Sequence, residues 1–404
     1  MIDLSPFFGI QENLLRNVPT KKRFLFNKIN WGNRLIGLVG GRGTGKTTLL
    51  LQHLAEKYEH TQNGLYISAD NIRVEAIGIY EIASQFIRMG GEVIIIDEIH
   101  KYFRWPQEIK NLYDSFPAAK ILFSGSSALV LQLGKSDLSR RAVFYTLSGL
   151  SFREYLQFTG RKGLPGAVSL TEILETHHKI ASQILKKGPI LGLFRDYLDH
   201  GVYPFFLEGI KEYLDRLGNI IEKILYEDIA TTSGIKTLNI AILKRILWLV
   251  ATSQPFEPNI ENISKHLGVS KPTVYSYLDY LERAGLLSGI MPEGSGSKLV
   301  RKPAKLYLKN TNLLRATAGA LSSEDPAGAV RETFMQHQLI SSGLRVRVPQ
   351  RVDFLVEDKY LFEVGGRSKR KHQITGKENA YIVKDDIDIG FGNVIPLWLF
   401  GFLY

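Results

Sequence analysis

One short segment contains the residue types that bind a polyphosphate: Gly40, Gly41, Arg42, Gly43, Thr44, Gly45, Lys46, Thr47 and Thr48. It fits the pattern G-x-x-x-x-G-K-[ST], in which glycines allow backbone N–H groups to turn toward a phosphate. We expect Lys46 to reach the β- and γ-phosphates and Thr47 to place its hydroxyl on Mg²⁺. The chemistry predicted from this segment is the binding of a nucleoside triphosphate with its metal ion.

Two adjacent carboxylates complete the predicted site. Asp97 and Glu98 follow Val93–Ile96, a β-branched run typical of a strand that is buried on both faces of a parallel sheet. Ligands of such sheets bind at the carboxyl ends of the strands. Asp97 is therefore predicted to hold Mg²⁺ across from Thr47, and Glu98 to polarise the attacking water. The alternative is a buried strand that ends in acids by chance, which the preceding loop disfavours.

Two further positions are candidates for catalysis. In P-loop ATPases a polar residue at the end of a neighbouring strand positions the attacking water, and Ser124 fits this place best, with Ser126 second. Arg141 is a candidate for reaching a γ-phosphate in its own or in a neighbouring subunit. The alternatives are a Ser/Gly turn without a catalytic role and an arginine that is ion-paired at the surface.

Strands and helices alternate around these residues. The apolar segment Leu35–Val39 is a predicted strand, which leads through the glycine-rich loop into a helix that ends near Tyr58. The other predicted elements of this part are the strands Leu65–Ser68, Val93–Ile96 and Ile121–Ser124 and the helices Ile79–Met89 and Pro106–Phe116. This alternation predicts an α/β P-loop NTPase core, with a parallel sheet and helices on both of its faces.

The chain is expected to divide into five segments. An N-terminal arm (1–30) precedes the ATPase core (31–158), and a helical lid or linker region (159–240) follows the core. A winged helix-turn-helix (241–310) and a small α+β C-terminal domain (311–404) complete the chain.

A helix-turn-helix is predicted from the pattern of short amphipathic segments after residue 259. Ile260–Leu267 is a short helix, Gly268–Ser270 a tight turn, and Thr273–Ala284 a second helix. Leu299–Leu308 is expected to return as a wing strand. In DNA readers the start of the second helix meets the major groove. The nucleic-acid candidates are therefore Lys271, Thr273, Tyr275, Ser276 and Tyr280 on the helix, and Lys298, Arg301, Lys302 and Lys305 on the wing and its border. The alternative, a lid that senses the nucleotide or contacts a protein, stays open.

Carboxylates of the C-terminal region are spaced as in metal-dependent nucleases. Asp353 and Glu363 lie in predicted strands joined by a turn, in the arrangement Asp…Glu-x-Lys, but Gly365 stands at the lysine position. Asp353 and Glu363 are candidate ligands of a second divalent cation, and Glu332 on the preceding helix could join them. Lys369 is expected not to replace the missing lysine, so a degenerate fold is favoured over an active nuclease.

The remaining C-terminal elements are predicted from apolar runs. They are the helix Ala329–Ser341 and the strands Leu344–Val348, Arg351–Val356 and Tyr360–Val364, with Val394–Tyr404 as a last buried strand. The basic cluster at 367–372 either grips phosphates or forms a solvated loop.

Composition is that of an ordinary globular protein. The 404 residues are 44% hydrophobic and 23% charged and include no cysteine, which excludes disulfides and thiolate metal sites. No signal peptide is recognised at the N-terminus, and no apolar run reaches the roughly 18 residues of a membrane span, so we expect a cytoplasmic protein. The net charge of +11 favours polyanionic partners such as nucleic acid, or reflects a generally basic surface.

The order of these parts resembles the prokaryotic AAA+-type ATPases, related to the archaeal ATPase and STAND groups, that carry a DUF-type C-terminal region. The matching segments are Gly40–Thr47, Ile94–His100 with Lys101 and Trp105, Leu122–Ser127, Leu150–Leu156, Tyr197–Pro204 and Ile263–Leu287. Phe362–Gly366 and Ile395–Tyr404 look like the corresponding segments of members from Bacteroides-type bacteria. Gly365, in place of a lysine, and Val202, where a glycine is common, depart from the pattern.

The resemblance implies ATP with Mg²⁺, a winged helix, and a restriction-endonuclease-like fold at the C-terminus. ATP rather than GTP rests on this resemblance, because the sequence has no Asn-Lys-x-Asp motif. Our first hypothesis is an ATPase whose nucleotide cycle moves the winged helix and the C-terminal domain, with duplex DNA as a candidate partner. The second is a slow, nucleotide-switched regulator that binds DNA or a protein, and the third is an ATP-gated nuclease. An oligomer is needed only if an arginine acts on a neighbouring subunit.

Overall fold

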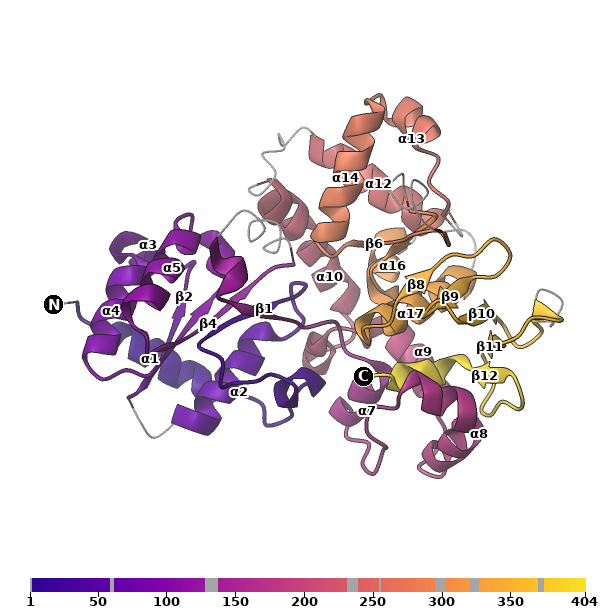
Figure 1. The fold of residues 1–404 in the computed structure, drawn as a ribbon, viewed down its shortest axis with the longest axis horizontal. Helices are drawn as coiled ribbons and strands as arrows, with labels where there is room; N and C mark the ends of the chain where they lie inside the picture. The colour runs from indigo at the N-terminus through magenta and orange to yellow at the C-terminus, as the bar shows by residue number, and fades with distance from the viewer. Residues whose placement is uncertain are drawn as a thin grey trace. The chain divides into compact units, whose positions relative to one another are not determined.

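The computed structural model describes residues 2–58, 62–127, 137–230, 239–253, 256–294, 303–319, 327–369 and 374–404 (Figure 1). They form two compact units, Met1–Ser148 and Gly149–Tyr404. Within the described residues, no helix combines the length and the apolar character needed to cross a membrane.

The first unit is built on a parallel sheet of five strands in the order β2-β3-β4-β1-β5. The strands are β1 Leu35–Val39, β2 Gly64–Ser68, β3 Val93–Asp97, β4 Lys120–Gly125 and β5 Val143–Thr146. The predicted parallel core is thereby confirmed. Strand β5 was not predicted, because it lies at the sheet edge and its residues are exposed or half-buried rather than a buried apolar run.

Helices cover both faces of this sheet, as predicted. The helices of the first unit are α1 Ser5–Leu15, α2 Lys46–Tyr58, α3 Ile72–Ile77, α4 Ile79–Arg88 and α5 Trp105–Ser115. Alternate strand residues point to opposite faces. One set packs with apolar residues of α4 and α5, and the other set packs with α2. The predicted arm contains α1, whose Gln11 hydrogen-bonds the backbone of Gly64 and Tyr66 on β2 at 3.1 and 2.7 Å.

His53 on α2 gives the first unit an expected sensitivity to acid. Its ring stacks on Trp31 at 3.8 Å, and burial, with the charge of Lys120 after it, lowers the pKa of His53 to about 4. Between the ordinary histidine pKa and about 4, only the unfolded state takes up the proton, so stability falls as the pH falls through this window. We expect the wild type to lose on the order of 3 kcal/mol more than His53→Phe between pH 7 and pH 4.5.

Urea unfolding at each pH, followed by tryptophan fluorescence, measures this difference. His178→Phe, which replaces an exposed histidine, serves as the control and should behave as the wild type does. Equal losses of stability in His53→Phe and the wild type would contradict the assignment.

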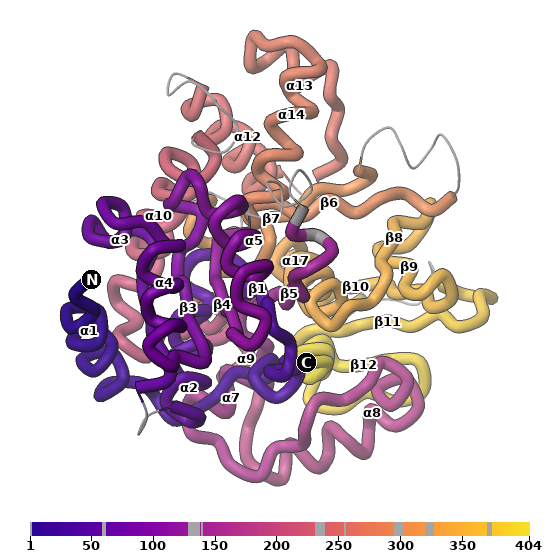
Figure 2. Tube along the Cα trace, turned by 60° about the vertical axis from the view of Figure 1, so that its left-hand side comes forward, coloured from indigo at the N-terminus to yellow at the C-terminus, as the bar shows by residue number. Residues whose placement is uncertain are grey.

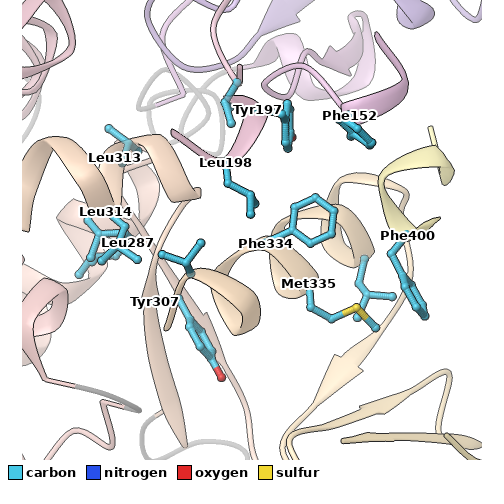
Figure 3. Packing of buried hydrophobic residues seen from close by; sticks show 14 of the residues in the cluster. Phe152, Tyr197, Leu198, Leu287, Tyr307, Leu313, Leu314, Phe334, Met335 and Phe400 are labelled. Carbon is cyan, nitrogen blue, oxygen red and sulfur yellow. The ribbon is translucent and has the colours of Figure 1, made fainter. Parts of the chain in front are cut away.

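The second unit begins with helices around one large apolar core. They are α7 Phe152–Phe158, α8 Leu170–Leu185, α9 Leu191–His200, α10 Tyr213–Lys223 and α12 Ile240–Thr252. Phe334, which lies further along the chain, packs edge-on against Phe194 of α9, with ring centroids 4.8 Å apart. Figure 3 shows Phe334 among Phe152, Tyr197 and Leu198, so segments far apart in sequence share this core.

The predicted helix-turn-helix is present as two helices joined by a tight turn. They are α13 Ile260–Leu267 and α14 Lys271–Arg283, and they lie together in both views of the fold (Figures 1 and 2). Gly268 ends α13 in the left-handed region at φ 66°, and the Ser270 hydroxyl caps α14 by accepting from Thr273 N at 3.3 Å. Two antiparallel strands follow, β6 Leu287–Ile290 and β7 Lys305–Leu308.

A mixed sheet with two helices closes the chain. The strand order is β12-β11-β10-β9-β8, where β9 pairs antiparallel with both of its neighbours and β10, β11 and β12 are parallel. The elements are α16 Thr311–Ala318, α17 Ala327–Ser341, β8 Val346–Arg347, β9 Phe354–Val356, β10 Tyr360–Gly365, β11 Ala380–Lys384 and β12 Val394–Pro396.

The prediction of a last buried strand at Val394–Tyr404 was wrong in its secondary structure. Strand β12 stops at Pro396, and Leu397–Phe402 forms a buried 3-10 helix that packs against α7, α8 and α17. Proline has no backbone N–H to extend a strand ladder, which explains the end of β12. Burial was predicted correctly from the apolar residues, but an apolar run does not by itself distinguish a strand from a helix.

Candidate nucleotide-binding site

The sheet order brings the predicted catalytic residues to one edge. Strand β4 lies between β1 and β3, so Ser124 on β4 stands between the glycine-rich loop after β1 and Asp97 at the end of β3. All these strands are parallel, and their carboxyl ends therefore meet at the same edge. The predicted convergence of Thr47, Asp97 and Ser124 is found in the structure.

Asp97 is the centre of the site. Its carboxylate is buried and accepts hydrogen bonds from Thr47 Oγ1 at 2.6 Å and Tyr66 Oη at 2.9 Å on one oxygen. The other oxygen accepts from Ser124 Oγ and from Glu98 N, the latter at 3.1 Å. The Thr47 hydroxyl and the Asp97 carboxylate thus face each other where both would bind one Mg²⁺.

The glycine-rich loop has a shape that requires glycine. Gly43 and Gly45 adopt positive φ values of 78° and 93°, and a Cβ added at Gly40 would lie 2.4 Å from the Leu147 carbonyl oxygen. Lys46 is buried, and its ammonium donates to the carbonyl oxygens of Gly40 and Gly41, each at 3.0 Å. The loop therefore curls around the lysine, at the start of α2, where a helix N-terminus favours an anion.

Arg23 clamps the loop from the side of the N-terminal arm. Its guanidinium is buried and donates to the carbonyl oxygens of Thr44 at 2.6 Å and Ser148 at 2.9 Å. Our sequence interpretation did not assign this residue a role. The basic run that contains Arg23 was the available signal, but no spacing rule connects it to Thr44.

Glu98 has an unusual backbone for a residue with a side chain. It lies in the left-handed region at φ 50° and ψ 37°, which costs about 1–3 kcal/mol and is found preferentially at functional sites. Its carboxylate lies 3.5 Å from Nε2 of His100, and Nδ1 of His100 accepts from Ser126 N at 3.5 Å. The imidazole of His100 therefore lies next to the predicted base, a neighbour that the sequence did not indicate.

Arg141 does not lie near this edge of the sheet. It precedes β5, whose first residue Val143 pairs with Ile36 near the start of β1, whereas Thr47 follows the end of β1. Its guanidinium forms two hydrogen bonds with Asp114 of α5, at 3.1 and 3.2 Å. The length of the strands therefore separates Arg141 from Thr47. A γ-phosphate bound by a neighbouring molecule stays the predicted target of Arg141.

The nucleic-acid candidates fall into two groups. On α14, Lys271, Tyr275 and Ser276 are exposed and Thr273 is half-buried, while the opposite face packs inward. Lys298, Arg301 and Lys302 lie outside the described residues.

The placement of Lys305 at a DNA-contacting border was wrong. Its side chain is buried and forms ion pairs with Glu332 and Asp353.

The second predicted cation site is also brought together in part. Asp353 precedes β9, and its Oδ2 accepts from Val364 N at 2.9 Å on the neighbouring strand β10, beside Glu363. Lys369 lies next to the position of the missing lysine, although whether it can replace that lysine stays a prediction. A Cβ at Gly365 would lie 2.6 Å from Lys369 Cδ, and the Lys369 ammonium is 2.5 Å from Glu363 Oε1.

Comparison with known proteins finds similarity in two parts of the chain. Residues 32–156 match the AAA domain family, and residues 191–324 match a domain of unknown function, DUF8612. An uncharacterized protein of Methanocaldococcus jannaschii is 31% identical over 291 residues, covering 67% of this chain and 60% of that protein. The chain thus spans 60% of the length of this relative.

Two solved structures show weak overall likeness. ORC1 of Aeropyrum pernix, in complex with DNA, is 12% identical at a TM-score of 0.30, covering 83% of this chain and 93% of that one. AMPPCP-bound DnaA from Aquifex aeolicus is 15% identical at a TM-score of 0.26, covering 70% and 89%. Scores this low carry no argument about function. The first unit thus has the parallel sheet flanked by helices of a P-loop NTPase core, and residues 32–156 of it are similar to the AAA domain family.

Proposed function

We propose that this protein is a Mg²⁺-dependent ATPase. The observation that carries the proposal is the 2.6 Å contact between Thr47, in the first turn of α2, and Asp97, at the end of β3, beside a loop that needs glycine at several positions. A hydroxyl and a carboxylate in this relation are suited to hold one Mg²⁺, either directly or through its water ligands. When bound, Mg²⁺ neutralises the charge of the phosphates and orients them.

Each residue of the edge then has one role in the proposal. Lys46 exchanges its two loop carbonyls for phosphate oxygens, which are stronger acceptors because they are charged. Glu98 accepts a proton from the attacking water, and Ser124 holds Asp97 and the backbone of Glu98 in place. Tyr66 adds a second anchor on Asp97, and burial and then Asp97 raise the pKa of Tyr66, so that its hydroxyl stays a donor.

The second unit is proposed to carry a winged helix that contacts duplex DNA. An additional bridge between Phe256 and Leu306 extends the β6–β7 pair, and such a small sheet next to α13 and α14 supports the proposed winged helix. The exposed start of α14, with Lys271 and Tyr275, is the face that such domains present to the major groove. In this proposal the nucleotide cycle moves the winged helix and the C-terminal domain. The C-terminal domain binds nucleic acid and does not cleave it.

One contact favours the alternative of a slow, nucleotide-switched regulator. The Glu98 carboxylate lies 3.5 Å from His100 Nε2, and a protonated imidazole there would compete with water for the carboxylate. If this competition makes hydrolysis slow, the protein stays in the ATP-bound form for long periods and acts by binding DNA or a protein.

Hydrolysis of ATP with Mg²⁺, measured in the steady state with and without duplex DNA, separates the two functions. Turnover that rises with DNA supports the DNA-coupled ATPase. Tight nucleotide binding with negligible turnover supports the regulator, and absence of nucleotide binding would contradict both.

Lys271→Ala is expected to weaken DNA binding across all sequences. If Lys271 neutralises one phosphate, its loss should reduce the slope of log affinity against log salt by about 1. Fluorescence anisotropy at several salt concentrations measures that slope. Lys223→Ala on α10 removes a similarly exposed lysine, 54% against 57% for the side chains, and should leave the slope unchanged. Equal slopes for Lys271→Ala and the wild type would remove α14 from the DNA interface.

A further inference from the structure

The second unit contains a cavity of about 170 Å³ that is bordered by α12, α16, α17 and strand β7. Figure 3 labels two of its lining residues, Leu314 and Tyr307. Most of the lining is apolar and comes from Val250, Phe256, Leu306, Leu308, Leu314 and Ala329. An apolar cavity of about 150 Å³ is large enough to hold benzene. This cavity therefore has room for one small ring or one branched alkyl group.

One carboxylate lies in this mostly apolar lining. Glu332 of α17 borders the cavity, and its side chain is 16% exposed. Two donors of β7 reach the same oxygen, since Lys305 Nζ lies 3.1 Å from Glu332 Oε2 and Tyr307 Oη donates to it at 2.7 Å. Within the part of the chain that the structure describes, no hydrogen bond reaches the other oxygen, Oε1. Glu332 Oε1 is thus an acceptor that is available to a ligand.

The charges around Glu332 are not balanced. Lys305 is 6% exposed and is shared by two carboxylates, because its Nζ also lies 3.2 Å from Asp353 Oδ1. One ammonium between two carboxylates leaves a surplus of one negative charge. Burial, and then the charge of Asp353, raises the pKa of Glu332, which is the direction expected for an incompletely compensated carboxylate. A cation beside Glu332 Oε1 would offset this surplus where solvent contributes little.

The same features disfavour other classes of ligand. An organic acid would place a second negative charge beside Glu332, and a purely apolar molecule would leave Glu332 Oε1 without a donor. Among the residues with described positions, no group of three acidic or imidazole side chains could hold a metal ion. The apolar lining also offers a hydrated metal ion few oxygen ligands.

We propose that this cavity binds a small primary amine with an apolar body. The ammonium donates to Glu332 Oε1, and the apolar body fills the space between α12, β7 and α17. The inference goes beyond the proposed ATPase, because the described lining residues all belong to the second unit and the site needs neither nucleotide nor DNA. An amine bound here would contact β7 and α17 together and stabilise the folded second unit.

Titration calorimetry of nucleotide-free, full-length protein with benzylamine and 3-methylbutylamine tests this proposal. Ligands of this size are expected to bind with a Kd of about 1 mM and to raise the melting temperature. Benzyl alcohol should bind about tenfold more weakly than benzylamine, because its hydroxyl is a neutral donor. Benzoate should not bind. Absence of binding by both amines at about 10 mM, or equal binding of benzoate and benzylamine, would overturn the proposal.

Two variants locate the binding site. Glu332→Gln should abolish the tenfold preference for benzylamine over benzyl alcohol, because the amide has no negative charge. Ala329 is half-buried and packs against the core, so Ala329→Phe should fill the cavity and prevent binding of both compounds.

Each variant has a matched control. Glu222→Gln removes another carboxylate that pairs with a lysine, Lys244, at 2.5 Å, and Ala241→Phe adds the same ring at an exposed position of α12. Both controls should bind the amines as the wild type does. An unchanged preference in folded Glu332→Gln, or unchanged amine binding in Ala329→Phe, would overturn the proposal. If Glu332→Gln does not fold, Ala329→Phe and the wild-type comparison of amine, alcohol and acid decide the outcome.

Discussion

Glu98→Gln is expected to bind ATP as the wild type does and to hydrolyse it about 10²–10⁴-fold more slowly, the usual contribution of a positioned general base. The amide keeps the size of the side chain but cannot accept a proton from water. The backbone at residue 98 should be unaffected, because glutamine and glutamate have the same steric demand in the left-handed region. Steady-state hydrolysis and titration with a fluorescent ATP analogue measure the two quantities separately.

Glu92→Gln is the matched control for this variant. Glu92 is an exposed residue immediately before β3, at the end opposite to Glu98, and its carboxylate accepts from Asn63 Nδ2 at 2.7 Å. Its substitution should leave turnover unchanged. Full turnover in Glu98→Gln would show that another group accepts the proton, whereas loss of binding would mean that the residue shapes the loop and does not act in the chemical step.

Lys46→Ala is expected to weaken nucleotide binding about ten- to a hundredfold, because hydrogen bonds to charged groups contribute about 1.5–3 kcal/mol. The lysine ammonium is already inside the loop, at 3.0 Å from the carbonyl oxygens of Gly40 and Gly41. Substitution removes the charge that attracts the phosphates and also the contacts that keep the loop curled. Titration with the same analogue measures the change in affinity.

Lys57→Ala at the other end of α2 controls for the loss of a positive charge from the same helix. Lys57 is exposed, and its loss should change nucleotide affinity little. Comparable affinity in Lys46→Ala and Lys57→Ala would exclude the assigned role of Lys46. A thermal melt of each variant in the absence of nucleotide shows whether the loop change has spread to the fold.

The first unit was predicted well because its signals are local. The glycines, Lys46 and Thr47 lie in one short segment between a strand and a helix, and Asp97 ends an unmistakably buried run. The predicted α13 has the observed bounds for the same reason, since Asn259 and Gly268 mark its two ends in the sequence. Strand β5 was missed because it pairs on one side only and its apolar run is short, with exposed or half-buried residues.

The residues that were missed or misplaced depend on partners far along the chain. Lys305 was interpreted as a surface charge, and its partners Glu332 and Asp353 lie 27 and 48 residues later. Tyr66 is an unremarkable strand residue until Asp97, 31 residues later, is placed beside it. A sequence pattern does not reveal these contacts of Lys305 and Tyr66. Such contacts depend on tertiary structure and have no fixed spacing along the chain.

The left-handed backbone of Glu98 implies a conflict between thermodynamic stability and chemistry at this position. Glycine would adopt the same φ and ψ without steric cost, and the folded state would be more favourable by that amount. Glycine would also remove the carboxylate. A search for more thermostable versions of this protein would therefore tend to replace Glu98, and would be expected to recover stable proteins that have lost turnover.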